Sequence, residues 1–215
     1  GAAMLGALVR TLRERGIQID GGVRRAASSA ERAGGEVVAQ HAVDLAPVLR
    51  AMNVHSRNVV ASTVFKLCGA QIDGVASWAS GEKAVRAMAR ARDIDDGRTR
   101  IVDGSGLSPE NRTTAALLVR LLSELDGDVL RGPLMYDSLA VSGVSGTLRK
   151  RLRSKGLKGR VHAKTGTLND VRVRGLAGYI DGRKGHPGYV FAILLNGRGA
   201  NTGVIDDLVR LVAKR

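Results

Sequence analysis

The chain of 215 residues is 44% hydrophobic, 25% charged and only 3% aromatic, and its 34 basic and 20 acidic residues leave a formal charge of +14. No apolar run approaches the roughly 18 residues of a membrane span, and a single cysteine rules out an internal disulfide. The four histidines, at positions 41, 55, 162 and 186, show no metal-ligand spacing, so we expect a globular protein without a metal ion or other cofactor.

The first forty residues are predicted to hold one helix and two short strands. The helix runs from about Ala3 to Arg15 and ends at Gly16, because its apolar residues recur on one face. Residues 17–23 and 34–43 have the composition of short strands. The opening segment lacks the basic start of a signal peptide and is amphipathic at once, so we interpret it as the interior of a longer protein.

Two further helices are predicted next. Asp44 can cap the first, which continues to about Asn53, and the second runs from near Ser56 to Cys68 and is ended by Gly69. Because Cys68 falls in the apolar run VVASTVFKLCG, we expect a buried structural thiol.

The middle of the chain is predicted to contain two helices separated by a glycine-rich loop. Residues 79–92 are helical, with Ser80 as the N-cap, and residues 113–125 form a strongly periodic helix. Between them, residues 99–111 form a short strand that runs into the loop sequence DGSG, residues 103–106. This loop lacks the Gly-x-Ser-x-Gly pattern of a nucleophile, so we interpret it as structural support.

The last third of the chain changes from helices to strands. Residues 159–167, 171–180 and 188–196 are predicted strands, the last two joined by a turn, and residues 202–215 close the chain as an amphipathic helix. Helices followed by an antiparallel meander and a terminal helix indicate an α+β fold, with helices packed on an antiparallel sheet.

Two short motifs carry the chemistry. Lys164, Thr165 and Gly166 form Lys-Thr-Gly in a predicted strand, where a glycine often marks the close approach of a ligand. Ser56 and Asn58 form Ser-x-Asn near a helix start, where helical geometry turns both side chains to one side. Each motif alone also fits a solvated lysine or an ordinary serine N-cap. Their order, about a hundred residues apart, is that of the second and third motifs of serine penicillin-recognising enzymes.

On these residues the chain resembles the C-terminal part of low-molecular-mass class C penicillin-binding proteins, the D-alanyl-D-alanine carboxypeptidase/endopeptidases. The resemblance runs from about Leu5 to Leu211 and includes, in family order, LAPVLRAMNVHSRN, DGSGLSPENR, VSGVSGTLRKRL and AKTGTLNDV. It implies a transpeptidase-like domain of the penicillin-binding-protein and β-lactamase fold, acting on peptidoglycan peptides that end in D-Ala-D-Ala. It also implies inhibition by β-lactams, no cofactor, and a periplasmic or extracellular location at the cell wall.

The resemblance implies two catalytic residues. Ser56 would relay protons between the nucleophile and the leaving amine, and Lys164 would attract anions and hold Ser56 poised. Both types suit the chemistry, because a peptide that ends in a carboxylate needs a cation near its end.

Four further residues would bind the substrate by the same resemblance. Asn58 would hydrogen-bond its amide backbone, and Thr165 would bind the terminal carboxylate of D-alanine. Gly166 would let the substrate strand lie flush against the sheet edge, and the backbone N–H of Thr167 would be one oxyanion donor.

The nucleophile expected for this family lies in an upstream Ser-x-x-Lys, separated from Ser-x-Asn by a large insertion. The one Ser-x-x-Lys here, Ser80 to Lys83, follows Ser-x-Asn instead. We therefore expect residues 1–215 to be the C-terminal portion of one transpeptidase-like catalytic domain, without the upstream segment and the insertion domain. The chain also departs from the family around Ser-x-Asn, with Arg57 in place of a small or acidic residue and Val59, Val60 and Ser62 in place of aromatic and Glu residues.

Two other functions stay open. The first is a catalytically inactive protein that binds peptidoglycan. The second is a basic binder of polyanions or nucleic acid, since residues 149–174 hold one acid, Asp170, and ten basic residues at 149, 150, 151, 153, 155, 158, 160, 164, 172 and 174. This stretch has no aromatic residue for base stacking, so we expect acidic wall polymers rather than nucleic acid as its partner, bound at a basic rim next to the cleft.

Overall fold

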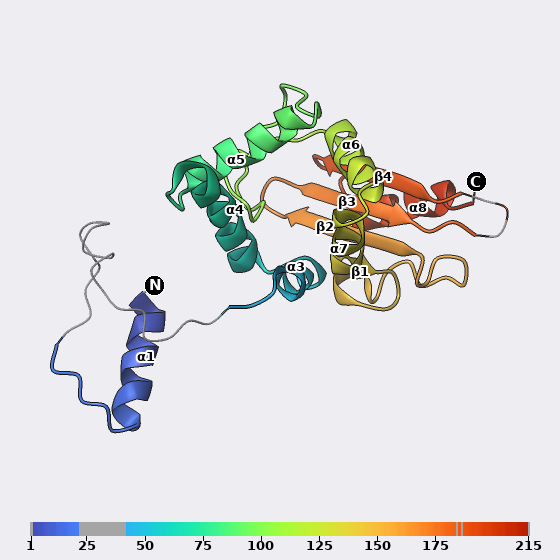
Figure 1. Ribbon diagram of the computed structural model, residues 1–215. Helices are drawn as coiled ribbons and strands as arrows, with labels where there is room; N and C mark the ends of the chain where they lie inside the picture. The colour runs from blue at the N-terminus through green and yellow to red at the C-terminus, as the bar shows by residue number, and fades with distance from the viewer. Residues whose placement is uncertain (1, 22–41, 184, 186, 215) are drawn as a thin grey trace. The chain divides into compact units, whose positions relative to one another are not determined.

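The computed structural model describes residues 2–21, 42–183, 185 and 187–214, which divide into an N-terminal unit, residues 1–42, and a larger unit, residues 43–215 (Figure 1).

In the N-terminal unit, helix α1 (Ala2–Glu14) ends where Gly16 adopts a left-handed φ of 79°, which confirms the predicted helix to within a residue. The strand predicted from residue 17 is wrong for residues 17–20, which are irregular. The strand predicted at 34–43 lies outside the described residues except for its last two, which are irregular.

Helices form the first half of the larger unit: α3 (Leu45–Val54), α4 (Asn58–Asp73), α5 (Trp78–Ala91), α6 (Ala115–Asp126) and α7 (Arg131–Ser138). The helices predicted before α4, at α5 and at α6 are confirmed. Helix α7 has only eight residues and was not predicted. Instead of the strand predicted from residue 99, the structure has a single bridge between Arg100 and Arg112.

Helix α4 continues beyond its predicted end. It passes through Gly69 to Asp73 and ends at Gly74, which has a left-handed φ of 69°. The backbone of Gly69 packs directly on Ser80 and Gly81 of α5, so closely that a Cβ would overlap both residues. The glycine at position 69 is therefore needed for helix packing, and the prediction that it ends the helix was wrong.

The thiol of Cys68 is exposed, so the prediction of a buried cysteine was also wrong. Helix α4 buries only Phe65 and Gly69, whereas Leu67 and Ile72 are 55% and 54% exposed. The apolar run around Cys68 is thus covered only in part, and the side of α4 that carries Leu67, Cys68 and Ile72 is left exposed among the described residues.

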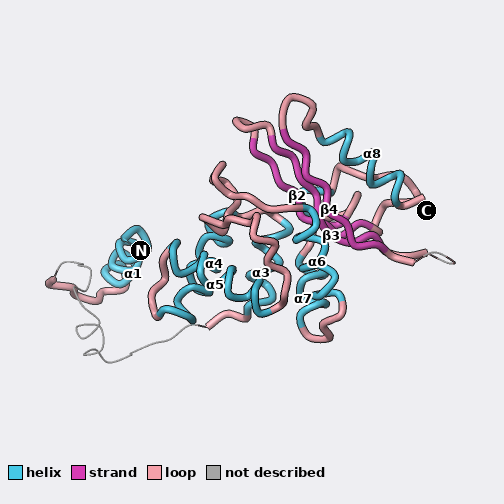
Figure 2. The backbone as a smooth tube through the Cα atoms, turned by 90° about the horizontal axis from the view of Figure 1, so that it is seen from above, coloured by secondary structure: helices cyan, strands magenta, loops and turns pink. Residues whose placement is uncertain are grey.

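A four-stranded antiparallel sheet forms the second half, with strands β1 (Ala140–Val141), β2 (Val161–Leu168), β3 (Val173–Ile180) and β4 (Tyr189–Asn196) in that order. The predicted meander and the terminal helix α8 (Thr202–Val212) are confirmed. Figure 2 shows the sheet between α8 on one side and α6 and α7 on the other. The fold is thus the predicted α+β arrangement.

The two faces of β2 point into different layers. Val161 and Ala163 are fully buried in the main core, together with Ile205 and Val209 of α8. Side chains alternate along a strand, so the side chain of Lys164 points to the other face of the sheet, which is covered by α6 and α7. The register agrees, because Lys164 lies opposite Ala177, which packs in the smaller core with α6 and α7.

The outer edge of β2 is open over the Lys-Thr-Gly motif. Strand β1 pairs with only two residues of β2, His162 and Ala163. Among the described residues, 164–168 therefore have no partner strand on that edge. An exposed sheet edge with free backbone groups can pair with an extended peptide.

Among the residues that the structure describes, no single helix is long and apolar enough to cross a membrane, and only α4 and α5 taken together, bent by 77°, have the length and composition.

Candidate active site

The side chains of Ser56 and Lys164 meet in the structure. Lys164 Nζ donates a hydrogen bond to Ser56 Oγ at 2.9 Å and a second to its neighbour's carbonyl, Thr165 O, at 2.8 Å. No carboxylate forms an ion pair with Lys164 in the described part of the chain. Burial lowers the pKa of Lys164 below its ordinary value, which makes this amine a better proton carrier than a solvated lysine.

Ser56 lies in the tight connection between α3 and α4 rather than at a helix start. Its φ is 52°, a left-handed conformation that is uncommon for a residue with a side chain. The following residue, Arg57, donates its backbone N–H to Met52 O at 2.9 Å, the hydrogen bond of a Schellman helix end. Asn58 then begins α4, so the two motif residues are positioned by the end of one helix and the start of the next.

Helix α3 is held in place from two sides. Asn53 Nδ2 donates to Ser138 Oγ at the end of α7, at 2.8 Å, and Ser138 Oγ donates to Met135 O at 2.7 Å. On the other side the backbone of Val54 packs against Gly146, which has a left-handed φ of 52° and no room for a side chain. These contacts fix the connection that carries Ser56.

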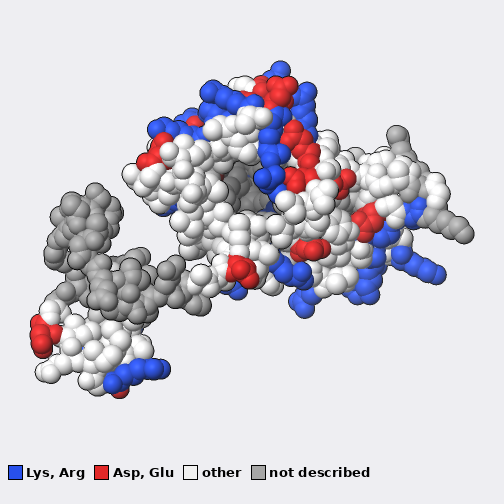
Figure 3. Space-filling view, viewed as in Figure 1, with Lys and Arg blue, Asp and Glu red and all other residues white. Residues whose placement is uncertain are grey.

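The six residues predicted for the site line one cleft of about 1160 Å³. Figure 3 shows the molecule hollowed between α4, α5 and the ends of the strands. The cleft is lined by the Ser56 connection, the loop after residue 100, the 3-10 helix η1 (Gly146–Leu148) and the ends of three strands, with predicted residues Ser56, Asn58, Lys164, Thr165, Gly166 and Thr167.

The open edge of β2 forms one wall of this cleft. Gly166 and Thr167 are both exposed there. A Cβ on Gly166 would meet no atom of the described residues nearer than 4.0 Å, so none of these residues requires glycine at this position. The methyl group of an alanine would instead project into space that a bound strand could use.

A second wall is the loop that carries Asp103, which is closed by hydrogen bonds to the carboxylate of that residue. The Asp103 carboxylate accepts hydrogen bonds from Gly106 N at 2.6 Å, Ser108 N at 2.9 Å and Asn111 Nδ2 at 3.1 Å. Burial alone would raise the pKa of Asp103, but the bonds from Asn111, Ser108 and Gly106 outweigh it and hold the pKa below its ordinary value. The interpretation of this loop as support agrees with its geometry.

Ser80 is not part of the cleft. Its hydroxyl is buried, donates to Val75 O at 2.6 Å and accepts from Ser77 N at 3.0 Å. Ser77 is the N-cap of α5 and Ser80 the third residue of the helix, so the prediction of Ser80 as the N-cap was wrong by three positions. Lys83 pairs with Asp73 at 2.9 Å, which leaves Ser80 without a base.

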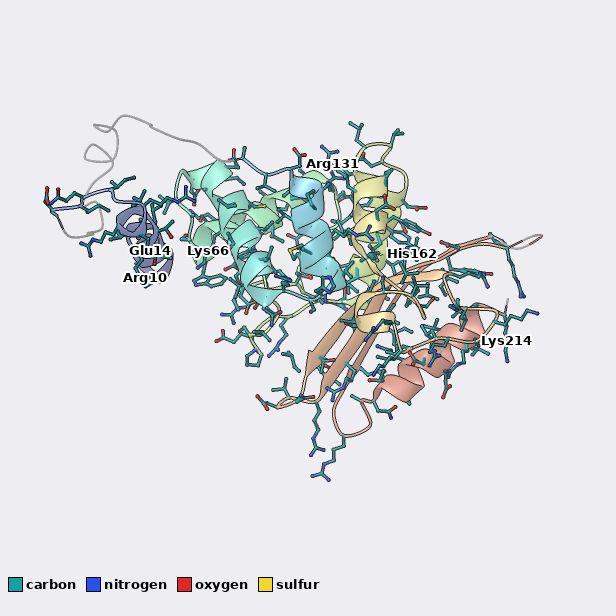
Figure 4. All side chains as sticks on the ribbon, turned by 90° about the horizontal axis from the view of Figure 1, so that it is seen from below. Arg10, Glu14, Lys66, Arg131, His162 and Lys214 are labelled. Atoms are coloured by element: carbon teal, nitrogen blue, oxygen red, sulfur yellow. The ribbon has the colours of Figure 1, made fainter. Side chains whose placement is uncertain are left out.

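A separate polar cluster lies where β2 meets α7 and includes His162, which is labelled in Figure 4. The ring of Tyr136 stacks on His162 with 4.0 Å between centroids, and the Tyr136 hydroxyl donates to Asp181 at 2.6 Å. Burial and the nearby Asp181 carboxylate raise the pKa of Tyr136. None of the three lines the cleft, and no group of three potential metal ligands occurs among the described residues.

The basic residues of segment 149–174 are spread over several surroundings and do not all lie at the edge of the cleft. Of these ten Lys and Arg residues only Lys164 lines the cleft. Arg151 donates three hydrogen bonds to the Asp206 carboxylate of α8, the shortest at 2.6 Å. Six of the cations are exposed and form no ion pair with a described acid, five of them at 149, 150, 153, 155 and 158 and the sixth at 172. Leu148, Leu152 and Leu157 anchor the loop at 149–158 in the main core.

Sequence reasoning missed two residues that shape the site, Asn111 and Thr147. Asn111 Oδ1 accepts from Val102 N at 2.8 Å and so closes the Asp103 loop. Thr147 lines the cleft, and its Oγ1 accepts from Thr165 Oγ1 at 3.0 Å. Both fall in segments that carried the family resemblance, but no periodicity or spacing gave either residue a role.

Comparison with known proteins places these residues in one family. The D-Ala-D-Ala carboxypeptidase 3 (S13) family model matches residues 2–214. The D-alanyl-D-alanine carboxypeptidase of Actinomadura sp. (strain R39) is 32% identical, over 91% of this chain and 37% of its own length. Carboxypeptidase DacB of Mycolicibacterium smegmatis is 31% identical, over 84% of this chain and 40% of its own length.

Solved structures agree with the sequence matches. Penicillin-binding protein 4 (dacB) from Haemophilus influenzae, crystallised with a β-lactam, has a TM-score of 0.66 and 26% identity, over 79% of this chain and 41% of that one. The Bd0816 predatory endopeptidase from Bdellovibrio bacteriovorus has a TM-score of 0.59 at 23% identity, a similarity of fold. The chain therefore spans about 40% of the length of these relatives, and it belongs to the D-Ala-D-Ala carboxypeptidase 3 (S13) family.

Proposed function

We propose that residues 1–215 form the C-terminal portion of the catalytic domain of a serine-type D-Ala-D-Ala carboxypeptidase/endopeptidase that acts on peptidoglycan peptides. The observation that carries the proposal is the 2.9 Å hydrogen bond between Lys164 and Ser56, which come from distant segments and meet at the cleft. A half-buried amine bonded to a hydroxyl can pass protons to and from a reacting group, a contribution of about 100- to 10,000-fold in rate.

The open edge of β2 supports the substrate-binding roles. An extended peptide can pair with residues 164–168, with Gly166 making room for its backbone. Its terminal carboxylate would then lie near the Thr165 hydroxyl and the Lys164 cation. Asn58, exposed at the opposite wall, would hydrogen-bond the peptide amide. The backbone N–H of Thr167 would serve as an oxyanion donor.

The nucleophile is proposed to lie on a segment outside these 215 residues. Ser56 accepts a hydrogen bond from Lys164 and is assigned to the proton relay. Ser80 is buried and does not line the cleft. Ser105 lines the cleft, but among the described residues no lysine or histidine hydrogen-bonds to it. Helix α4 also leaves Val59 80% exposed, directly after the cleft residue Asn58. A further segment that packs on Val59 would lie close to Ser56, where it would supply the nucleophilic serine and its lysine.

The proposed partners follow from the same chemistry. A site for D-Ala-D-Ala would bind β-lactams as inhibitors, and its substrate would place the protein outside the cytoplasm at the cell wall. The exposed cations on the loop at 149–158 support a weaker attraction to acidic wall polymers. That attraction should fall with salt, because exposed charges are screened over about 8 Å at physiological ionic strength. Binding to purified wall that is unchanged in molar salt would contradict it.

The test is the release of D-alanine from a peptide ending in D-Ala-D-Ala by the full-length protein. Lys164→Met and Ser56→Ala should each reduce kcat/KM by about 100-fold or more, because each removes the proton path. Ser80→Ala is the matched control and should keep the wild-type rate constant. If the wild-type protein binds the peptide but releases no D-alanine, the alternative of an inactive wall-binding protein is correct.

A further inference from the structure

Thr147 stands at the cleft without a role in the reaction described above. It lies in the middle of η1, is exposed, and accepts a hydrogen bond from the Thr165 hydroxyl at 3.0 Å. Thr165 is the residue proposed to meet the substrate carboxylate. The two hydroxyl groups thus form a pair at the open end of the strand edge.

The position of η1 is set by the same contacts that place Ser56. Gly146, immediately before Thr147, packs on the backbone of Val54, and a side chain there would overlap it. Leu148, immediately after, is fully buried in the main core. Thr147 is therefore held between a glycine that touches α3 and a leucine that anchors the loop, so its hydroxyl is preorganised toward β2.

The number of hydroxyl protons that Thr147 and Thr165 can donate decides how the pair can bind a carboxylate. A threonine hydroxyl has one proton to donate and can accept as well. In the structure the Thr165 proton is given to Thr147. A carboxylate can only accept, so when it binds, Thr165 must turn its proton toward the ligand. The Thr165 oxygen can then accept the proton of Thr147, which keeps both hydroxyls bonded.

We propose that Thr147 is a positioning residue for the terminal carboxylate of the substrate, acting through the hydroxyl of Thr165. The inference rests on the proposed function and adds a determinant of specificity to it. When Thr147 donates to Thr165 and Thr165 donates to the carboxylate, the first hydrogen bond polarises the Thr165 hydroxyl. The hydrogen bond from Thr165 to the charged carboxylate is then stronger. A ligand whose carboxylate is masked would gain nothing from Thr147.

The experiment compares acylation of the full-length protein by penicillin and by its methyl ester, in the wild type and in Thr147→Val and Thr147→Ser. For penicillin, Thr147→Val should lower the second-order acylation rate constant by about 3- to 10-fold, the range of one ordinary hydrogen bond. The loss should appear as a higher penicillin concentration needed for half-maximal acylation, and the acylation rate constant at saturating penicillin should stay unchanged. For the methyl ester the valine variant should match the wild type, and Thr147→Ser should match the wild type with both ligands.

Each other outcome points to a different failure. Equal losses with penicillin and its ester would show that valine disturbs the fold of η1, and the inference would be wrong. A valine variant indistinguishable from the wild type with penicillin would also overturn it. If the wild-type protein is not acylated at all, the proposed function fails, and this inference fails with it.

Discussion

The left-handed backbone of Ser56 can be measured separately from its hydroxyl. Ser56→Ala and Ser56→Gly both remove the group that accepts from Lys164, so their difference reports only the backbone. A side chain in this conformation destabilises the folded state by about 1–2 kcal/mol. Glycine in place of alanine stabilises the unfolded state by about 0.4–1 kcal/mol, because it raises the conformational entropy of the unfolded chain. The glycine variant should therefore be the more stable of the two by about 1 kcal/mol.

Urea unfolding of the two variants measures this difference through their midpoints at equal slope. Ala87→Gly is the matched control, because Ala87 is exposed inside α5, where glycine should destabilise by about 1 kcal/mol. The full-length Ser56→Ala and Ser56→Gly proteins should be equally slow with penicillin, since both lack the hydroxyl. If Ser56→Gly proved equal to or less stable than Ser56→Ala, the left-handed strain at this connection would be refuted.

Three further predictions test other parts of the structure. Burial lowers the pKa of Lys164, so between that lowered pKa and the ordinary 10.5 the unfolded chain binds more protons than the folded one. The free energy of unfolding of the wild type, relative to that of Lys164→Met, should therefore rise with pH across this window. A difference in urea midpoints that does not change with pH would contradict this prediction. Ser80→Ala should lower the free energy of unfolding by about 1–2 kcal/mol by breaking the α5 capping box, and an unchanged midpoint would show that the box is not formed. In the folded chain of residues 1–215, maleimide should label Cys68 as fast as in urea, and strong protection would show that Cys68 is not on an exposed side of α4.

The layers of the fold followed from local patterns. Strands β2, β3 and β4 and the terminal helix α8 alternate or repeat their apolar residues clearly, so each was found within a few residues. Gly69 and Cys68 were misjudged because their surroundings depend on how α5 packs against α4. A local pattern does not contain the position of a neighbouring helix, so a glycine that permits contact and a glycine that ends a helix look alike.

The site was predictable in its residues but not in its geometry. Ser-x-Asn and Lys-Thr-Gly named five of the residues that line the cleft because their order along the chain resembled a family, and Thr167 directly follows the second motif. The turn that carries Ser56 depends on contacts of Val54 with Gly146, which lies far away in the sequence. Thr147 could not be found in advance, since its role depends on a hydroxyl pair formed only in three dimensions.

The most direct test of the central claim is the site at which penicillin acylates the full-length protein. Digestion and mass spectrometry of the labelled protein locate the penicilloyl group. We expect one stoichiometric adduct, on a serine outside residues 1–215, and no adduct in the Lys164→Met variant. An adduct on Ser56, Ser80 or Ser105 would contradict the proposal that this chain supplies the proton relay and the carboxylate pocket while another segment supplies the nucleophile.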